Sequence, residues 1–260
     1  MLYVVRYLLI VLYTVFWGTL GLLLSALDRS GEAVIWVARN WVRWILGTCG
    51  VQVDVSGLEH LDPSRPYVVM ANHQSVFDTA AIVATLPSSF RFVAKRELTW
   101  IPFFGWALAA SGHVIIDRAN RASSVRSLER AAERVRGGKT VVIFPEGTRV
   151  PTGELGEFKS GGFHLALAAQ VPILPVSVSG SSRITPPHSL RIESGRIHVH
   201  YGEPIPTAGL GLDDRQRLKE LARSAILAGF EPGLEPGRVP RSLTVPKPRG
   251  YPEHASRPRG

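Results

Sequence analysis

The chain has 260 residues, of which 45% are hydrophobic, and it carries a formal net charge of +9 at pH 7. Its single cysteine, Cys49, excludes an internal disulfide framework and cysteine-rich zinc sites. The positive charge indicates an anionic partner, which can be a nucleic acid, an anionic lipid or a phosphorylated substrate.

The first predicted element is the uncharged segment 7–27. As a helix of roughly 30 Å it is long enough to cross a bilayer. A signal peptide is the alternative interpretation, but only Arg6 precedes the apolar run and no clear cleavage motif follows it. We therefore expect a retained membrane segment.

A second helix is predicted in the stretch EAVIWVARNWVRWILG. Its polar residues fall on one narrow stripe, and the rest of its surface is apolar and rich in tryptophan, which favours membrane interfaces. The stripe consists of Glu32, Arg39, Asn40 and Arg43. A globular helix buried on most sides is the alternative. We expect residues 1–47 to form a membrane-anchoring helical hairpin, with the main domain on the cytoplasmic face if the first helix spans.

From about Val51 the pattern changes to apolar runs of strand length, such as VQVDV, YVVMA, TVVIF and ILPVSVS. Amphipathic stretches of helix length lie between several of them, most clearly 122–136 and 213–227. This alternation predicts an α/β domain over residues 48–229, with a largely parallel mixed sheet flanked by helices. Residues 230–260 are rich in proline, glycine and basic residues, which predicts a disordered tail. That tail either contacts anionic lipid or is merely solvated.

The stretch VVMANHQSVFD places His73 and Asp78 where a buried strand gives way to a helix. Ser75 to Asp78 fits the capping-box pattern S-x-x-D, so Asp78 needs no catalytic role. If the helix begins after Ser75, however, His73 lies in the incoming loop and Asp78 can point back towards it. The same local structure thus permits a helix cap and also a base with its orienting acid.

A second polar turn follows the strand-like run VVIF. It consists of Glu146, Gly147, Thr148 and Arg149. Ligands bind at strand ends in α/β sheets, and Arg149 can direct two hydrogen bonds onto a phosphate. Lys159 is a second cation nearby in the sequence, although a simple turn is the alternative. The run GHVIIDR similarly ends with Asp117 and Arg118, for which a surface ion pair is the alternative.

Four ordered motifs resemble the blocks of the glycerolipid acyltransferases, and the closest match is the 1-acyl-sn-glycerol-3-phosphate acyltransferase (lysophosphatidic acid acyltransferase) type. They are NHQSVFD (72–78), GHVIIDR (112–118), FPEGTR (144–149) and VPILPV (171–176). The segment AKRELTWIPFFG (94–105) is similar to the family's K-x-x-L-x-x-x-P segment. The resemblance covers about residues 50–205. Val150 departs from it, because serine is common there, and the tail after Gly229 has no counterpart.

The resemblance implies acyl transfer from acyl-CoA or acyl carrier protein to the sn-2 hydroxyl of lysophosphatidate, giving phosphatidate, without a metal or further cofactor. His73 would be the general base, and Asp78 would orient its ring and stabilise the imidazolium. Lys95 and Arg149 would hold the acceptor phosphate, with Arg118 as a further candidate. The residues that would shape the site are Asn72, Glu146, Gly147, Thr148 and Pro172. The expected partners are the two substrates and membrane lipids, and no nucleic acid.

Other interpretations explain less of the sequence. A serine hydrolase could use Ser75 beside His73, but no G-x-S-x-G elbow occurs. A metal enzyme could use His198 and His200, which alternate onto one strand face, but no third ligand cluster is apparent. A non-enzymatic protein that binds anionic lipid would explain the charge and the anchor, but not the four motifs. Within the family, glycerol-3-phosphate, other lysophospholipids and glycolipids remain alternative acceptors.

Overall fold

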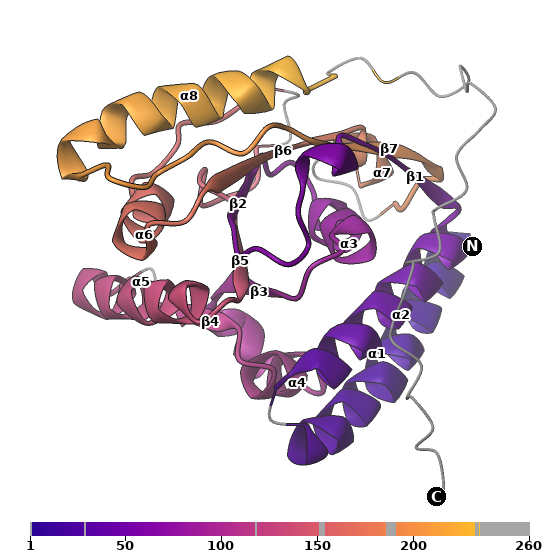
Figure 1. Cartoon of the computed structure of the whole chain (residues 1–260). Helices are drawn as coiled ribbons and strands as arrows, with labels where there is room; N and C mark the ends of the chain where they lie inside the picture. The colour runs from indigo at the N-terminus through magenta and orange to yellow at the C-terminus, as the bar shows by residue number, and fades with distance from the viewer. Residues whose placement is uncertain are drawn as a thin grey trace, which may run out of the picture.

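A seven-stranded sheet forms the centre of the protein, and helices cover both of its faces (Figure 1). The structure is a computed structural model that describes residues 2–28, 30–117, 119–150, 154–185, 191–231 and 234. The strands are β1 (Val51–Ser56), β2 (Val68–Ala71), β3 (Phe90–Lys95), β4 (Val114–Ile116), β5 (Thr140–Ile143), β6 (Ile173–Ser179) and β7 (Gly195–Tyr201). The α-helices are α1 (Leu2–Leu27), α2 (Glu32–Cys49), α3 (Val76–Thr85), α4 (Phe104–Ala110), α5 (Arg121–Arg136), α6 (Gly161–Ala169), α7 (Ser181–Ile184) and α8 (Arg215–Ala228). Short 3-10 helices are η1 (Leu58–His60), η2 (Arg96–Trp100) and η3 (Leu212–Asp214).

The strand order across the sheet is β1-β7-β6-β2-β5-β3-β4. Strands β6, β2, β5, β3 and β4 are mutually parallel, whereas β7 is antiparallel to β6 and pairs in parallel with β1. The prediction of a largely parallel mixed sheet flanked by helices is therefore confirmed. Because the five parallel strands point the same way, their carboxyl ends meet at one edge of the sheet, which we call the carboxyl edge.

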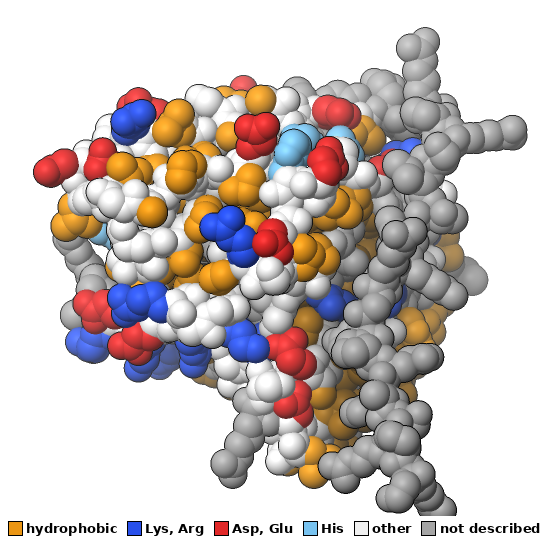
Figure 2. All heavy atoms as spheres, viewed as in Figure 1, with side chains coloured by type: hydrophobic (Ala, Val, Ile, Leu, Met, Phe, Trp, Pro, Cys, Tyr) orange, Lys and Arg blue, Asp and Glu red, His pale blue; other side chains and the backbone are white. Residues whose placement is uncertain are grey.

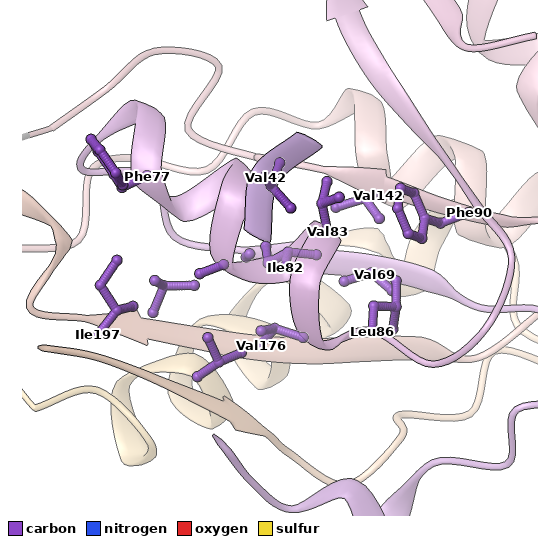
Figure 3. Packing of buried hydrophobic residues seen from close by; sticks show 14 of the residues in the cluster. Val42, Val69, Phe77, Ile82, Val83, Leu86, Phe90, Val142, Val176 and Ile197 are labelled. Carbon is purple, nitrogen blue, oxygen red and sulfur yellow. The ribbon is translucent and has the colours of Figure 1, made fainter. Parts of the chain in front are cut away.

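Alternate residues of the buried strands face opposite sides of the sheet, which gives the domain two cores. Val69 and Ala71 of β2 face the core beneath α2 and α3, whereas Val68 and Met70 face the core beneath α5, α6 and α8. Figure 3 shows the first core, in which apolar side chains of α3 pack against those of the sheet. Full burial of each large aliphatic side chain contributes about 1.5–3 kcal/mol to folding. The sheet is therefore a firm support for the residues at its edge.

Helices α1 and α2 form a hairpin that packs against α3 and α4 (Figure 1). Helix α2 contributes Ile35, Val42 and Leu46 to the core that it shares with α3. In the described part of the chain, α1 is the one helix long and apolar enough to cross a membrane. Figure 2 shows hydrophobic side chains over the hairpin, at the lower right. The division of the chain at residues 47 and 229 stays a prediction, and of the predicted tail (230–260) only residues 230, 231 and 234 are described.

The polar stripe of α2 lies partly against the α/β domain. The Arg39 guanidinium donates hydrogen bonds of 2.8, 3.2 and 3.0 Å to the carbonyls of Leu86, Pro87 and Ser88, at the carboxyl end of α3. A cation at this position satisfies carbonyls that lack helical partners and suits the helix dipole. The Glu32 carboxylate accepts a 2.7 Å hydrogen bond from the Lys139 ammonium. These two polar residues therefore dock the hairpin onto the domain, whereas Arg43 stays exposed.

Polar contacts also hold α1 near both of its ends. Close to its start, the Arg6 guanidinium donates a hydrogen bond to the carbonyl of Ile192. Just beyond its end, the Ser30 carbonyl accepts a 2.7 Å hydrogen bond from the buried Arg91 guanidinium. Helix α1 consequently lies along the domain, with one side packed and the other side exposed.

Candidate active site

Segments that are distant in the sequence meet at the carboxyl edge of the sheet. The motif NHQSVFD follows β2, the motif FPEGTR follows β5, and Lys95 is the last residue of β3. These three strands are neighbours in the order β2-β5-β3. Adjacent strands lie about 4.8 Å apart, so the three segments line one short stretch of this edge.

His73 and Asp78, the two residues predicted to be catalytic, are in contact. The Nδ1 atom of His73 lies 2.9 Å from Oδ2 of Asp78. The contact follows from how α3 begins, because Ser75 is its N-cap residue and has an extended backbone, with φ −146° and ψ 164°. Asp78 then lies in the first helical turn and points back towards the incoming loop. The Asp78 side chain is fully buried, while the His73 side chain is 18% exposed.

The Asp78 carboxylate caps α3 and contacts the histidine with the same oxygen. Its Oδ2 atom also accepts hydrogen bonds from the backbone N–H groups of Gln74 (2.6 Å) and Ser75 (2.8 Å). The Ser75 hydroxyl accepts one from the Phe77 N–H at 3.2 Å, which completes the capping box. Three donors thus converge on one oxygen, so the carboxylate is held in place.

The His73 ring is held in one orientation by Phe144, the first residue of the FPEGTR motif. The two rings stack with their centroids 4.0 Å apart and their planes 16° apart. A hydrogen bond from Nδ1–H to the Asp78 carboxylate leaves the lone pair on Nε2. Among the described residues no group forms a hydrogen bond with Nε2, so this atom can accept a proton from a substrate.

Glu146 joins the two motifs through the backbone of His73. Its Oε1 atom accepts a hydrogen bond from the His73 N–H at 2.8 Å, and its Oε2 atom accepts one from the Gly156 N–H at 2.9 Å. The Val150 N–H donates to the His73 carbonyl at 2.7 Å. Glu146 is 3% exposed, and this burial raises its pKa although the two backbone donors favour the charged form. Glu146 therefore positions His73 rather than facing solvent.

Asn72 and Pro172 lie at opposite ends of their strands. The buried Asn72 side chain accepts a hydrogen bond from the Val178 N–H (2.7 Å) and donates one to the Val178 carbonyl (2.8 Å). It thereby extends the pairing of β2 with β6 to the carboxyl edge. Pro172 precedes β6, and its carbonyl accepts a 3.0 Å hydrogen bond from the N–H of Val68, the first residue of β2. The structure therefore places Pro172 at the other edge of the sheet, away from His73.

Exposed cations surround the FPEGTR turn. Arg149 and Thr148 are exposed, and Gly147 has a left-handed conformation with φ +70°. The Lys159 ammonium lies over this glycine, since a Cβ atom added to Gly147 would be 3.1 Å from the Lys159 Nζ. Arg149 and Lys159 thus offer positive charge at the two ends of the same turn.

Two other predicted phosphate ligands are placed differently. Lys95 is 48% exposed at the end of β3, and its ammonium is 3.1 Å from the Glu97 carboxylate. Strand β5 separates β3 from β2, so Lys95 lies to one side of the segment that carries His73. Arg118 lies outside the described residues. Asp117, before it, forms a 2.8 Å ion pair with Arg96.

The residues of the two alternative chemistries have other partners. The Ser75 hydroxyl lies 2.6 Å from the Thr185 hydroxyl in addition to capping α3. His198 and His200 both contact the Ser56 hydroxyl, each at 2.9 Å. No group of three or more histidine, cysteine, aspartate or glutamate side chains in the described ranges is arranged to hold a metal ion.

Sequence reasoning missed Phe144, Thr185 and the two backbone donors of Asp78. The position of Phe144, at the end of β5 and within a recognised motif, was a signal that could have indicated contact with the site. Thr185 is 110 residues away from Ser75 in the chain. No local pattern marks such a contact, because it depends on the order of the strands.

Comparisons with known proteins agree with this geometry. The family model described as Acyltransferase matches residues 52–179. The chain is 37% identical to 1-acyl-sn-glycerol-3-phosphate acyltransferase alpha of Ovis aries over 190 residues, which cover 73% of this chain but only 66% of that relative. It is 32% identical to 1-acyl-sn-glycerol-3-phosphate acyltransferase of Pseudomonas aeruginosa over 250 residues, which cover 94% of this chain and 95% of that one. The crystal structure of the 1-acyl-sn-glycerophosphate acyltransferase PlsC from Thermotoga maritima has a TM-score of 0.76 and 29% identity, covering 88% of this chain and 93% of that chain.

Proposed function

The chain belongs to the acyltransferase family, and on this basis we propose that it acylates the sn-2 hydroxyl of 1-acyl-glycerol-3-phosphate (lysophosphatidate) to give phosphatidate. The acyl donor is a thioester, either acyl-CoA or acyl carrier protein. The names of the relatives support this acceptor. The single observation that carries the chemistry is the 2.9 Å contact between His73 and Asp78.

The proposed reaction has two proton transfers through His73. The acceptor hydroxyl oxygen attacks the thioester carbonyl carbon, and Nε2 of His73 takes the hydroxyl proton as the C–O bond forms. Asp78 stabilises the resulting imidazolium, as the acid of a catalytic triad does. The tetrahedral intermediate then collapses, the C–S bond breaks, and the leaving thiolate takes the proton from His73. The products are an ester and a free thiol, so atoms and charges balance.

A direct transfer fits the surroundings of His73 better than an acyl-enzyme does. The nearest hydroxyl in the motif belongs to Ser75, which caps α3 and contacts Thr185. The hydroxyl of the acceptor therefore takes the place of the serine of a triad, and no covalent enzyme intermediate is required.

We assign the acceptor phosphate to the cations around the FPEGTR turn. Arg149 can form two charge-assisted hydrogen bonds with a phosphate, and Lys95 adds a second positive charge from β3. Lys159, which lies over Gly147, is a third cation at this place. Arg118 remains a candidate from the sequence alone.

We also propose that the hairpin attaches the enzyme to a membrane, with the α/β domain on the cytoplasmic side. Helix α1 has the length and hydropathy of a membrane segment, and only 17% of its most apolar window is buried. Lysophosphatidate and phosphatidate carry long acyl chains, and moving such a chain into water costs about 0.8 kcal/mol per CH₂ group. Attachment at the lipid surface removes this cost during catalysis.

The decisive experiment is an acyl-transfer assay of the purified full chain. Release of the free thiol measures turnover, and identification of the lipid product shows which acceptor is acylated. The acceptors are lysophosphatidate, glycerol-3-phosphate and lysophosphatidylcholine, each tested with acyl-CoA and with acyl carrier protein. We expect phosphatidate from lysophosphatidate, and no transfer by the His73→Ala variant. Faster transfer to another acceptor than to lysophosphatidate would overturn the proposed substrate assignment. Normal turnover by His73→Ala would overturn the proposed role of His73 as the general base.

A further inference from the structure

The segment after β3 carries large hydrophobic side chains on its surface, and acyl transfer as proposed uses none of them. Trp100 is 66% exposed, Trp106 50%, Ile101 44% and Leu98 37%. They belong to η2, to α4 and to the turn between these two helices. We call these four residues the η2–α4 patch. Contiguous exposed apolar side chains of this kind mark an interaction surface.

Close packing fixes the patch to α1. A Cβ atom added to Gly18 would lie 2.8 Å from the Phe103 Cβ, and one added to Gly21 would lie 3.6 Å from the Ala107 Cβ. Phe103 has a positive φ of 61°, which is rare for a residue with a side chain. The unusual turn directs the inner side of α4 onto the hairpin and leaves Trp106 on the outside. Figure 1 shows α4 beside the hairpin.

Exposed apolar side chains also occur on α1, close to its contact with α4. Leu23 and Leu27, in the half of α1 that α4 touches, are 63% and 84% exposed. All six tryptophans of the chain lie either on the hairpin or in the η2–α4 patch. Four of them are at least 47% exposed, namely Trp36, Trp44, Trp100 and Trp106. Tryptophan prefers the boundary between water and lipid, so this distribution favours a lipid surface over a protein partner.

Charged groups border the patch on the side of the sheet. Lys95 and Arg96 are 48% and 56% exposed and precede Leu98, with Glu97, the ion-pair partner of Lys95, between them and the apolar residues. The Arg96 guanidinium lies 6.0 Å from the centre of the Trp100 ring and also pairs with Asp117. Long cationic side chains beside exposed aromatic rings suit the headgroup layer of a membrane, where the charge stays hydrated.

We propose that the η2–α4 patch inserts into the lipid surface beside α1 and forms a second membrane contact. This inference rests on the membrane attachment that we propose for the hairpin. Because Lys95 ends β3 at the carboxyl edge and η2 follows directly, the patch fixes this edge against the lipid. The hairpin attaches the protein, and the patch sets the direction in which His73 faces.

The test measures how close single labelled positions come to lipid. Trp100→Cys and Trp106→Cys are prepared separately in the full chain and labelled with an environment-sensitive fluorophore, while the buried Cys49 stays in place. Leu221→Cys on α8 is the matched control, since Leu221 is a 44% exposed apolar residue outside both the hairpin and the patch. Leu23→Cys reports on the hairpin. The vesicles contain equal amounts of phosphatidylcholine and phosphatidylglycerol, with or without doxyl groups on the acyl chains.

We expect the doxyl lipids to quench the labels at positions 100, 106 and 23 severalfold more than the label at 221. Quenching at 23 but not at 100 or 106 would overturn the second contact and leave the hairpin attachment intact. Absence of quenching at all three positions would overturn both. Circular dichroism checks that each variant is folded. Quenching requires no turnover, so the result is independent of whether the acyl-transfer assay succeeds.

Discussion

The Asp78 carboxylate lies 2.9 Å from the Nδ1 atom of His73 and accepts two backbone hydrogen bonds with the same oxygen. Helix capping and orientation of the histidine are thus one structural feature. The chain needs the cap to begin α3, and the position of the cap brings the carboxylate to the ring. Substitutions can nevertheless separate the two roles, because the cap requires an acceptor and the imidazolium requires a negative charge.

The Asp78→Asn variant makes this separation. Asparagine still offers an oxygen to the N–H groups of Gln74 and Ser75, so we expect stability to change by about 1 kcal/mol or less. Without the negative charge we expect kcat to fall by about 10³–10⁴, as in triads that lose their acid. The checks are kcat in the thiol-release assay and the free energy of unfolding. Turnover close to that of the unsubstituted chain would show that Asp78 is only a cap.

The Glu146→Gln variant tests whether Glu146 positions His73. One oxygen of the carboxylate becomes an amide NH₂ group, which cannot accept a hydrogen bond. Either the His73 N–H or the Gly156 N–H therefore loses its acceptor. We expect a loss of about 1–3 kcal/mol in stability, because a buried donor loses its partner. We also expect kcat to fall more than KM changes, since the base is displaced. Glu154→Gln, at an exposed position of the same loop, is the control and should alter neither quantity.

The Arg149→Ala variant tests the phosphate site. A charge-assisted hydrogen bond contributes about 1.5–3 kcal/mol, so its removal should raise the KM for lysophosphatidate by roughly 10- to 150-fold. The KM for the acyl donor should stay the same, and Arg149→Lys should recover only part of the loss, because lysine cannot bind in a bidentate manner. Arg136→Ala, an exposed arginine at the end of α5, is the control. An effect confined to the donor would refute the assignment.

Much of this site could be predicted because its parts are local. The strand before His73, the capping pattern and the turn after β5 each occupy fewer than about ten residues, and strand ends are where α/β sheets bind ligands. The contact of His73 with Asp78 follows from the helix start alone. The sequence could not show that Pro172 lies at the opposite edge. That position depends on the direction in which β6 runs beside β2, and only the structure gives this direction.

The partners of the polar stripe on α2 show the limit of periodicity. Helical spacing places Glu32 and Arg39 on one face, and that much is correct. Periodicity does not say what the face meets, and the sequence favoured a membrane interface. In the structure, Arg39 binds carbonyls at the end of α3 and Glu32 binds Lys139, both distant in sequence. A polar stripe that docks onto its own domain has the same pattern as one that faces lipid headgroups.

His113 makes the stability of the fold depend on pH. Its Nδ1 atom accepts a 2.7 Å hydrogen bond from the Phe92 N–H, and burial, followed by the charges of Arg91 and Arg134, lowers its pKa from 6.5 to about 3. The unfolded chain therefore binds one more proton than the folded protein between these values. We expect the free energy of unfolding to fall as the pH drops below about 6.5, by at most about 1.4 kcal/mol per pH unit.

Denaturant unfolding in detergent, repeated at several pH values from about 7 down to about 4, measures this slope. The His113→Asn variant retains an acceptor for the Phe92 N–H but does not titrate, so its slope should be smaller. His60→Asn, on η1, is the control. An unchanged slope in His113→Asn would assign the pH dependence to other groups.

The contact of Gly18 with Phe103 fixes α4 to α1, and Gly18→Ala tests it. The new methyl group would lie 2.8 Å from the Phe103 Cβ and 3.1 Å from its carbonyl carbon, so the helices must separate. We expect the free energy of unfolding to fall by about 1–3 kcal/mol, which is typical of an overpacked contact.

Gly47→Ala is the matched control, because Gly47 is also helical but has nothing within 4 Å of the added atom. Alanine there should stabilise the protein by up to about 1 kcal/mol through helix propensity. Thermal unfolding in detergent compares the two variants, and equal midpoints would mean that α4 is not held by this contact.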